Sequence, residues 1–278
     1  MTSAMNPALP VAEATSGNLE LTTEEYLLAW HHLRLGLVHW NLQPPAGSSL
    51  PSEKQRTVEE RMAAQRQAWE AMRARGLAGT RQLAPELEDA LHLIARPAVE
   101  LNARLDLPTG RCTVVGCARG EHAVLAQLSE VGMRIRGARS TALPTAVAEV
   151  IPDRPMGSGT AVSVPAELLA DHQGMTGAEV ERALLRGGLR PDDAYRFRAM
   201  LRGPKLGGGK FGAARRDREG ARRAAEFVVT YYDTERGGYT IEQKRGVDRR
   251  RWYTLAPASR PQLAQRLAHL LDSMRIER

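Results

Sequence analysis

Two groups of short apolar or alternating runs, separated at several junctions by glycine, set the order of elements that this chain can form. Alternation at every second residue is typical of a strand with one buried face, and glycine at the junctions favours tight turns between antiparallel neighbours. The sequence therefore predicts two antiparallel meanders. The predicted strands are 99–107, 111–118, 121–128 and 131–138 in the first meander, 210–215, 225–232, 239–244 and 250–255 in the second, and a short strand at 161–164 between them.

Helix signals precede the first meander. A threonine at 22–23 can cap a helix, and Ser52 with Gln55 has the spacing of a capping box. The long helix that follows Ser52 is expected to stop at Gly76, and Pro85 stands where the first turn of a third helix is expected.

The same signals return before the second meander. Thr176 and Glu179 form a second capping-box pattern, the helix is expected to end at Gly188, and Pro191 opens a short helix. A final helix is expected to begin at Pro261. The two halves of the chain thus share one order of elements.

This shared order suggests an internal repeat. Gly76-Leu77 corresponds loosely to Gly188-Leu189, and Pro144, which opens a short helix after the first meander, corresponds to Pro261, at offsets of about 112 to 117 residues. We therefore predict an α+β fold with a central antiparallel sheet, helical subdomains and a quasi-twofold internal repeat, in which both copies share the sheet.

The length and hydropathy of the chain favour one cytoplasmic domain. We expect residues 1–20 to be a disordered leader and 21–278 to be a single domain with half-repeats at about 21–152 and 160–278. No apolar run reaches the roughly 18 residues of a membrane span, and the N-terminus lacks the basic start and apolar centre of a secretory signal, so no membrane insertion is expected. Cys112 and Cys117 are an odd number of residues apart in one predicted strand, which places them on opposite faces as buried apolar residues.

Patterns that could carry catalysis fail on spacing. In the glycine-rich run 203–212, glycine stands at 209 where a phosphate-binding loop needs lysine, so we interpret the run as a flexible loop that enters a strand. The histidines at 31, 32 and 39 have no acidic partner at ligand spacing, and Gly157-Ser158-Gly159 lies in a proline-flanked linker instead of a nucleophile elbow. The sequence predicts no catalytic residue, cofactor or metal, and hence no enzyme.

The formal charge of +7 leaves one alternative open. Basic residues gather around two predicted hairpin turns, at 215–223 and 244–251, and such clusters can bind nucleic acid. Only Trp252 and Tyr253 offer aromatic rings for base stacking there, so solvated hairpin ends are the preferred interpretation. A basic nucleic-acid-binding or regulatory module remains the alternative function, ahead of an unrecognised enzyme.

Several segments in order along the chain resemble the EspG family of type VII (ESX) secretion chaperones. They are Glu59-Glu60-Arg61, Arg75-Gly76-Leu77, Leu91 to Pro97, Gly208-Gly209-Lys210-Phe211-Gly212, the run from Tyr232 to Tyr239, and Trp252-Tyr253-Thr254-Leu255-Ala256-Pro257. The resemblance covers about 21–271. One departure is Gly238, where the family tends to have arginine.

The resemblance implies a cytosolic chaperone that binds helical PE/PPE-like or WXG-type secretion substrates, keeps them soluble and directs them to their ESX system. A rigid, partly apolar docking surface is then required, and such an exposed surface allows the chain to pair with a copy of itself when no cargo is bound. The family has no docking motif that aligns here, so the predicted contacts are a hypothesis, and an equally good interpretation places their apolar members in the core. The predicted partner-binding residues are Arg119, Gly120, Glu121, Leu189, Tyr195, Phe197 and Met200.

Overall fold

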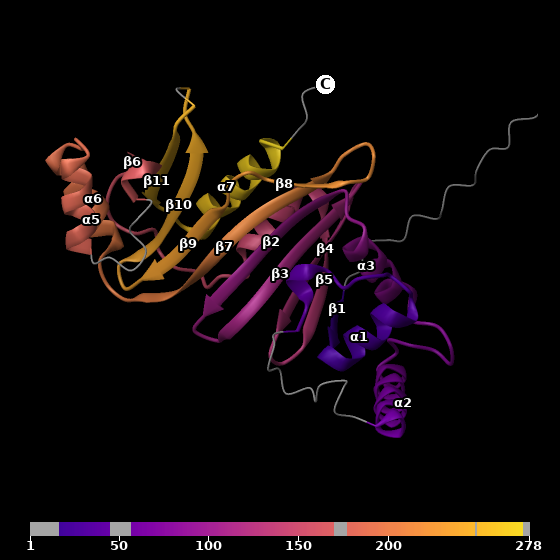
Figure 1. Ribbon diagram of the computed structural model, residues 1–278. Helices are drawn as coiled ribbons and strands as arrows, with labels where there is room; N and C mark the ends of the chain where they lie inside the picture. The colour runs from indigo at the N-terminus through magenta and orange to yellow at the C-terminus, as the bar shows by residue number, and fades with distance from the viewer. Residues whose placement is uncertain (1–16, 45–56, 170–176, 248, 275–278) are drawn as a thin grey trace, which may run out of the picture.

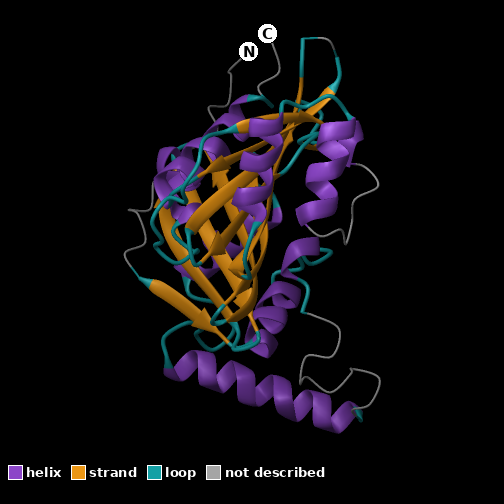
Figure 2. Ribbon diagram, turned by 90° about the vertical axis from the view of Figure 1, so that its left-hand side faces the viewer, coloured by secondary structure: helices purple, strands orange, loops and turns teal. Residues whose placement is uncertain are grey.

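The computed structural model describes residues 17–44, 57–169, 177–247 and 249–274. These residues form one antiparallel sheet with helices on both of its faces (Figure 1, Figure 2). The strands are β1 (Asn18–Leu21), β2 (Val99–Leu107), β3 (Gly110–Arg119), β4 (His122–Ser129), β5 (Met133–Arg139), β6 (Val162–Pro165), β7 (Lys205–Arg216), β8 (Arg222–Ala224), β9 (Val229–Thr234), β10 (Gly237–Arg245) and β11 (Arg251–Pro257). The α-helices are α1 (Thr23–His32), α2 (Val58–Ala74), α3 (Pro85–Ala95), α4 (Leu143–Ala148), α5 (Gly177–Arg186), α6 (Pro191–Leu201) and α7 (Arg260–Asp272), and the 3-10 segments are η1 (Trp40–Leu42), η2 (Ser140–Ala142) and η3 (Ala166–Leu169).

The two predicted meanders meet in the middle of the sheet. The strand order is β1-β5-β4-β3-β2-β7-β9-β10-β11-β6, with β8 paired to β7 outside this path. β2 and β7 form the junction and pair antiparallel from Val99 opposite Arg215 to Asp106 opposite Gly208. The prediction of an α+β fold with a central antiparallel sheet is therefore confirmed.

One face of the sheet is covered in its middle. Leu143 and Val147 of α4 and Leu263 and Leu267 of α7 pack with Phe211 and the neighbouring strands in the largest core cluster. On the opposite face, α1 and α3 pack over β3 to β5, whereas α5 and α6 pack over β6, β9, β10 and β11. On that face, in the described part of the chain, Figure 1 shows no α-helix over β2 and β7.

Capping residues set where the first helices begin. Thr22 caps α1 in a capping box with Glu25, as the threonines at 22–23 predicted. The predicted box of Ser52 and Gln55 lies outside the described residues, and α2 begins at Val58 behind a box made by Thr57 and Glu60. Thr176 also lies outside the described residues. Two successive capping patterns, at 52–55 and 57–60, precede α2, and sequence alone does not decide between them.

Matching glycine caps end α2 and α5. Gly76 has a φ of +74° and Gly188 a φ of +84°, values that favour glycine at the end of a helix. The next residue donates its N–H back to the carbonyl five residues earlier, from Leu77 to Met72 and from Leu189 to Leu184. The predicted stops at both glycines are confirmed.

The glycine-rich run is a strand, so its interpretation as a flexible loop was wrong. β7 begins at Lys205 and includes Gly207 to Gly209. A Cβ atom at Gly209 would lie 2.1 Å from the carbonyl oxygen of Arg104, and one at Gly208 would lie 2.3 Å from that of Tyr231. The glycines are present because neighbouring backbones approach closely, which sequence composition does not distinguish from a loop.

Two further strand predictions differ from the structure. β8 and β9 lie along β7 as one interrupted strand, because Ala224 pairs with Ala214 and Val229 with Phe211, five residues against three. Residues 225–228 therefore bulge out, and the strand predicted at 225–232 begins four residues later. β1, which begins in the last three residues of the predicted leader (1–20), was not anticipated because it is a four-residue edge strand with only Leu21 buried.

The two cysteines lie on opposite faces of β3, as predicted. Cys112 belongs to the core under α4 and α7, and Cys117 to the core under α1 and α3. Both are free thiols, and burial raises the pKa of each, most strongly that of Cys117. They act as small core residues. Among the described helices, none is long and apolar enough to cross a membrane.

Candidate functional site

The candidate site is the part of the face opposite α4 and α7 that lies over β2, β7 and β9, which no described α-helix covers and which η1 borders, and we call it the open face. It is formed by side chains that alternate with the core residues Leu101, Ala103 and Phe211 and therefore point to the other side. The open face consists of Glu100, Asn102, Arg104 and Asp106 of β2, Lys210 and Gly212 of β7, and Thr230 of β9.

A buried carboxylate anchors one end of the open face. Glu100 is 2% exposed and accepts hydrogen bonds from Arg222 Nε at 3.0 Å, Arg222 Nη2 at 2.8 Å and Asn102 Nδ2 at 2.8 Å. His39 Nε2 lies 3.2 Å from the carboxylate, an ion-pair distance without hydrogen-bond alignment. Burial alone would raise the pKa of Glu100, but His39 and Arg222 outweigh it and lower the pKa to about 2.

This cluster is structural. Through Glu100, it connects Arg222 of β8 and His39, the residue before η1, to the central strand β2. These three segments are far apart in sequence. The cavity beside it, lined by His39, Pro97, Glu100 and Arg222 among others, measures about 30 Å³. That is room for about one water molecule, so the cluster cannot hold a substrate.

A half-exposed tryptophan borders the open face. Trp40 is 45% exposed, and the guanidinium carbons of Arg104 and Arg222 lie 5.1 and 5.9 Å from its ring centroid. Leu37, three residues earlier, is 95% exposed. Tryptophan and arginine are the side chains most enriched at the energetic centres of protein interfaces. The arrangement suits protein binding.

The structure separates the predicted partner-binding residues. Arg119, Gly120 and Glu121 are exposed in the β3–β4 turn, where Gly120 has a φ of +61° and the Arg119 guanidinium donates to the carbonyl of Arg96. Leu189 and Tyr195 lie at the far end of the sheet, before and on α6, and Tyr195 is 64% exposed.

Phe197 and Met200, which were also predicted as partner contacts, are buried. Each is 2% exposed in the core cluster under α5 and α6, and the Met200 carbonyl accepts a hydrogen bond from Tyr232. The alternative interpretation as core residues is correct. Four strands, β2, β7, β9 and β10, separate β3 from β11, on which α6 packs. At about 4.8 Å per strand, the two predicted regions are roughly 24 Å apart and do not form one patch.

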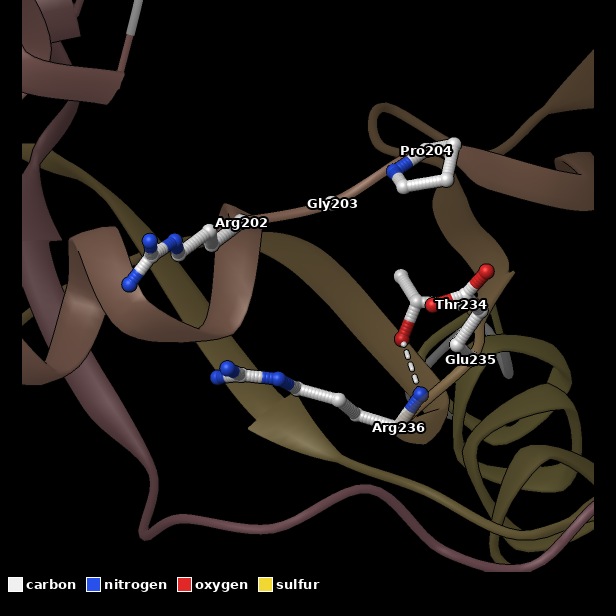
Figure 3. Close-up of a pocket in the computed structure, with 6 residues that line it drawn as sticks. All are labelled: Arg202, Gly203, Pro204, Thr234, Glu235 and Arg236. Atoms are coloured by element: carbon white, nitrogen blue, oxygen red, sulfur yellow. Dashed lines mark hydrogen bonds between the residues drawn. The ribbon is translucent and has the colours of Figure 1, made fainter.

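A hollow lies beside this end of the sheet (Figure 3). Arg202, Gly203 and Pro204 line it before β7, and Thr234, Glu235 and Arg236 line it at the β9–β10 turn. It measures about 220 Å³, and the side chains of Arg202 and Arg236 extend in the same direction from its two sides. Thr234 is buried and bonds to its own turn, whereas the other lining residues are exposed. This shallow polar hollow lacks the apolar walls of a small-molecule site.

The other patterns weighed in the sequence have structural roles. A Cβ at Gly157 would lie 2.2 Å from the Tyr239 ring, and Ser158 uses its carbonyl to accept the Tyr239 hydroxyl, so this segment is pinned and not a nucleophile elbow. No group of histidine, cysteine and carboxylate side chains suited to a metal occurs among the described residues.

Ion pairs occupy much of the basic charge on the two hairpins. Arg222 pairs with Glu100 and Arg223 with Asp217, while Glu226 lies within ion-pair distance of both Arg245 and Arg251. Among the described residues, these ion pairs leave fewer unpaired cations on the hairpins for nucleic acid than the sequence alone suggests.

The sequence analysis missed Arg104 and Trp40. The signal was present in β2, where polar residues occupy every second position, Glu100, Asn102, Arg104 and Asp106. In a strand at the centre of a sheet, that pattern indicates a face without a helix on it.

The comparisons with known proteins agree with this architecture. A sequence model of the EspG family matches residues 22–269. Among solved structures, the fold is similar to the Mycobacterium tuberculosis type VII secretion system chaperone EspG5, solved in complex with the PE25-PPE41 dimer. The TM-score is 0.70 at 17% sequence identity, over 94% of this chain and 98% of that chain. No curated protein matches the chain.

Proposed function

Because this chain belongs to the EspG family, we propose that it is a cytoplasmic chaperone of type VII secretion that binds helical PE/PPE-like substrates. It keeps them soluble and directs them to their ESX system. The observation that carries the proposal is the family match over 22–269, which spans both meanders and the helices around them. The similar fold of a chaperone captured with a PE–PPE dimer supports it.

We propose the open face as the docking surface. Its strands are backed by α4 and α7 and flanked by the two helical subdomains, so they form a rigid floor. A preorganised floor lowers the entropy cost of binding an elongated helical partner. The Arg119–Glu121 turn, Leu189 and Tyr195 remain proposed secondary contacts, which one partner could touch only by reaching beyond the open face.

We further propose that 21–278 is one domain made of two half-repeats, about 21–152 and 160–278. The strand order supports this, because β2-β3-β4-β5-β1 and β7-β9-β10-β11-β6 run outward from the central pair. The matching caps at Gly76 and Gly188 support it as well, as do the prolines in the first turns of α3 and α6 and of α4 and α7.

Co-expression tests the function. The chain is produced with the PE/PPE-like pair encoded beside its gene, and a soluble three-chain complex is expected on size exclusion. A pair from a different ESX locus serves as the control and should not co-elute. If the neighbouring pair is soluble alone and never co-elutes, the proposed function is wrong.

A further inference from the structure

Two like charges face each other at the centre of the open face. Arg104 of β2 and Lys210 of β7 are directly opposite in the antiparallel register, so their side chains lie on the same side of the sheet. Both are exposed, and among the described residues no acidic side chain lies within ion-pair distance of either. Like charges directly opposite one another destabilise a sheet, so this pair works against the stability of the free protein.

Arg104 is held in place despite that cost. Its Nε donates to Asn41 Oδ1 at 3.1 Å, and Trp40 stacks on its guanidinium. Asn41 is itself 1% exposed, and its amide donates to the carbonyls of Ala103 at 3.0 Å and Val114 at 3.1 Å. A buried side chain thus fixes an exposed arginine, which is the arrangement expected of a binding group oriented before its ligand arrives.

Lys210 has no side-chain neighbour on the same face of its own strand. The nearest residues of β7 on the same face are Gly208 and Gly212, and opposite it on β9 is the half-buried Thr230. Neither glycine has a side chain, so no neighbour on β7 shields the ammonium group, and the Asn102 amide lies beside Gly212.

We propose that Arg104 and Lys210 form a carboxylate-binding pair, which receives an acidic side chain of the helical cargo while an adjacent apolar side chain packs on Trp40. The proposal rests on the proposed function and names what the open face recognises. Charge complementarity gives the carboxylate, and an exposed indole beside it gives the apolar neighbour. Asp106 lies two residues along β2 on the same face and would repel an extended polyanion, so one localised anionic group fits better than nucleic acid.

The experiment compares stability with binding. The Lys210→Glu variant replaces a like-charge pair by an opposite-charge pair, so we expect its melting temperature to rise by about 1–3 °C. Its affinity for the co-expressed PE/PPE-like pair should fall about tenfold or more, and Lys210→Gln should show a smaller loss. Arg218→Glu, the same charge change at the tip of the β7–β8 hairpin, is the control and should leave binding unchanged.

The outcomes are separable. If the wild-type chain binds the pair and Lys210→Glu binds it equally well, the carboxylate-binding pair is refuted and the proposed function stands. A variant with both lower affinity and a lower melting temperature would also refute it, since the lysine would then be structural. If the wild-type chain binds no pair, the proposed function fails and this inference fails with it.

Discussion

Glu100 offers the sharpest test of how the open face is built. Its carboxylate is buried and bonded to Arg222 and Asn102, with His39 beside it. Glu100→Gln keeps the shape of the side chain but removes the charge. It leaves Arg222 without its anionic partner, and breaking a buried ion pair on one side is strongly destabilising.

The magnitude follows from the pKa of Glu100, which is about 2 in the folded protein against an ordinary value of 4.5. A difference of one pKa unit corresponds to about 1.4 kcal/mol, so the charged carboxylate stabilises the fold by about 3 kcal/mol at neutral pH. Because the folded pKa is lowered, this stabilisation is present above pH 4.5 and is lost as the pH falls towards 2. At pH 3 about 1.4 kcal/mol of it remains.

Urea unfolding at pH 7, 5 and 3, followed by circular dichroism, measures the effect. We expect Glu100→Gln to lower the free energy of unfolding by about 3 kcal/mol at pH 7 and by about half as much at pH 3. Asp106→Asn, on the same strand and face but exposed, is the matched control and should change it by less than about 0.5 kcal/mol at each pH. A difference for Glu100→Gln that is below 1 kcal/mol, or that stays constant with pH, would refute the reasoning.

Three further substitutions test the packing. Phe197→Ala should lower the free energy of unfolding by about 3–5 kcal/mol because it empties a core position. Tyr195→Ala on the same helix is the control and should change it by less than about 0.5 kcal/mol. Equal effects of the two substitutions in urea titrations would contradict the burial of Phe197. Gly209→Ala places a Cβ 2.1 Å from the Arg104 carbonyl oxygen and should lower the free energy of unfolding by about 1–3 kcal/mol in the same assay. An unchanged urea midpoint would show that β2 and β7 are farther apart than this. Gly238→Arg introduces the residue expected from the family and should prevent folding. Its Cβ would lie 2.3 Å from the Tyr231 hydroxyl and 2.5 Å from the Ala258 carbonyl oxygen. A cooperative thermal transition at the wild-type temperature would disprove this steric clash.

Local signals in the sequence were enough to predict most elements. The stop at Gly76, the start at Pro85 and the strands of the first meander depend on residues within a few positions of one another, and the structure has them nearly where predicted. The features that were missed depend on contacts between distant segments. Glu100 meets Arg222 across 122 positions, and the glycines of β7 are explained only by the carbonyls of Arg104 and Tyr231 on neighbouring strands.

The burial of two predicted binding residues was missed for the same reason. The four predicted residues of the second group are apolar or aromatic and close in sequence, so the sequence suggested one surface: Leu189, Tyr195, Phe197 and Met200. On α6, however, Phe197 and Met200 point into the core, whereas Tyr195 points to solvent. Arg104 was not predicted as a binding residue because its proposed role depends on residues distant in sequence. The register of β2 with β7 places Lys210 opposite it, and the position of η1 places Asn41 and Trp40 beside it.

The topology explains why the binding surface lies where it does. Each meander is followed by a helix, α4 or α7, and both helices return to the middle of the sheet on the same face, where they pack together. The helices that precede the meanders, α1 to α3 and α5 to α6, pack on either side of the central pair on the opposite face, so joining the meanders at β2 and β7 leaves no described α-helix over this pair on that face, where the short η1 packs on β2 and β3. The side chains of Arg104 and Lys210 are exposed, so they can change at a small packing cost. We therefore expect an exchange of the residues at 40, 104 and 210 between chains of this fold to transfer most of the cargo preference. An exchange of these three side chains that leaves cargo choice unchanged would place recognition elsewhere.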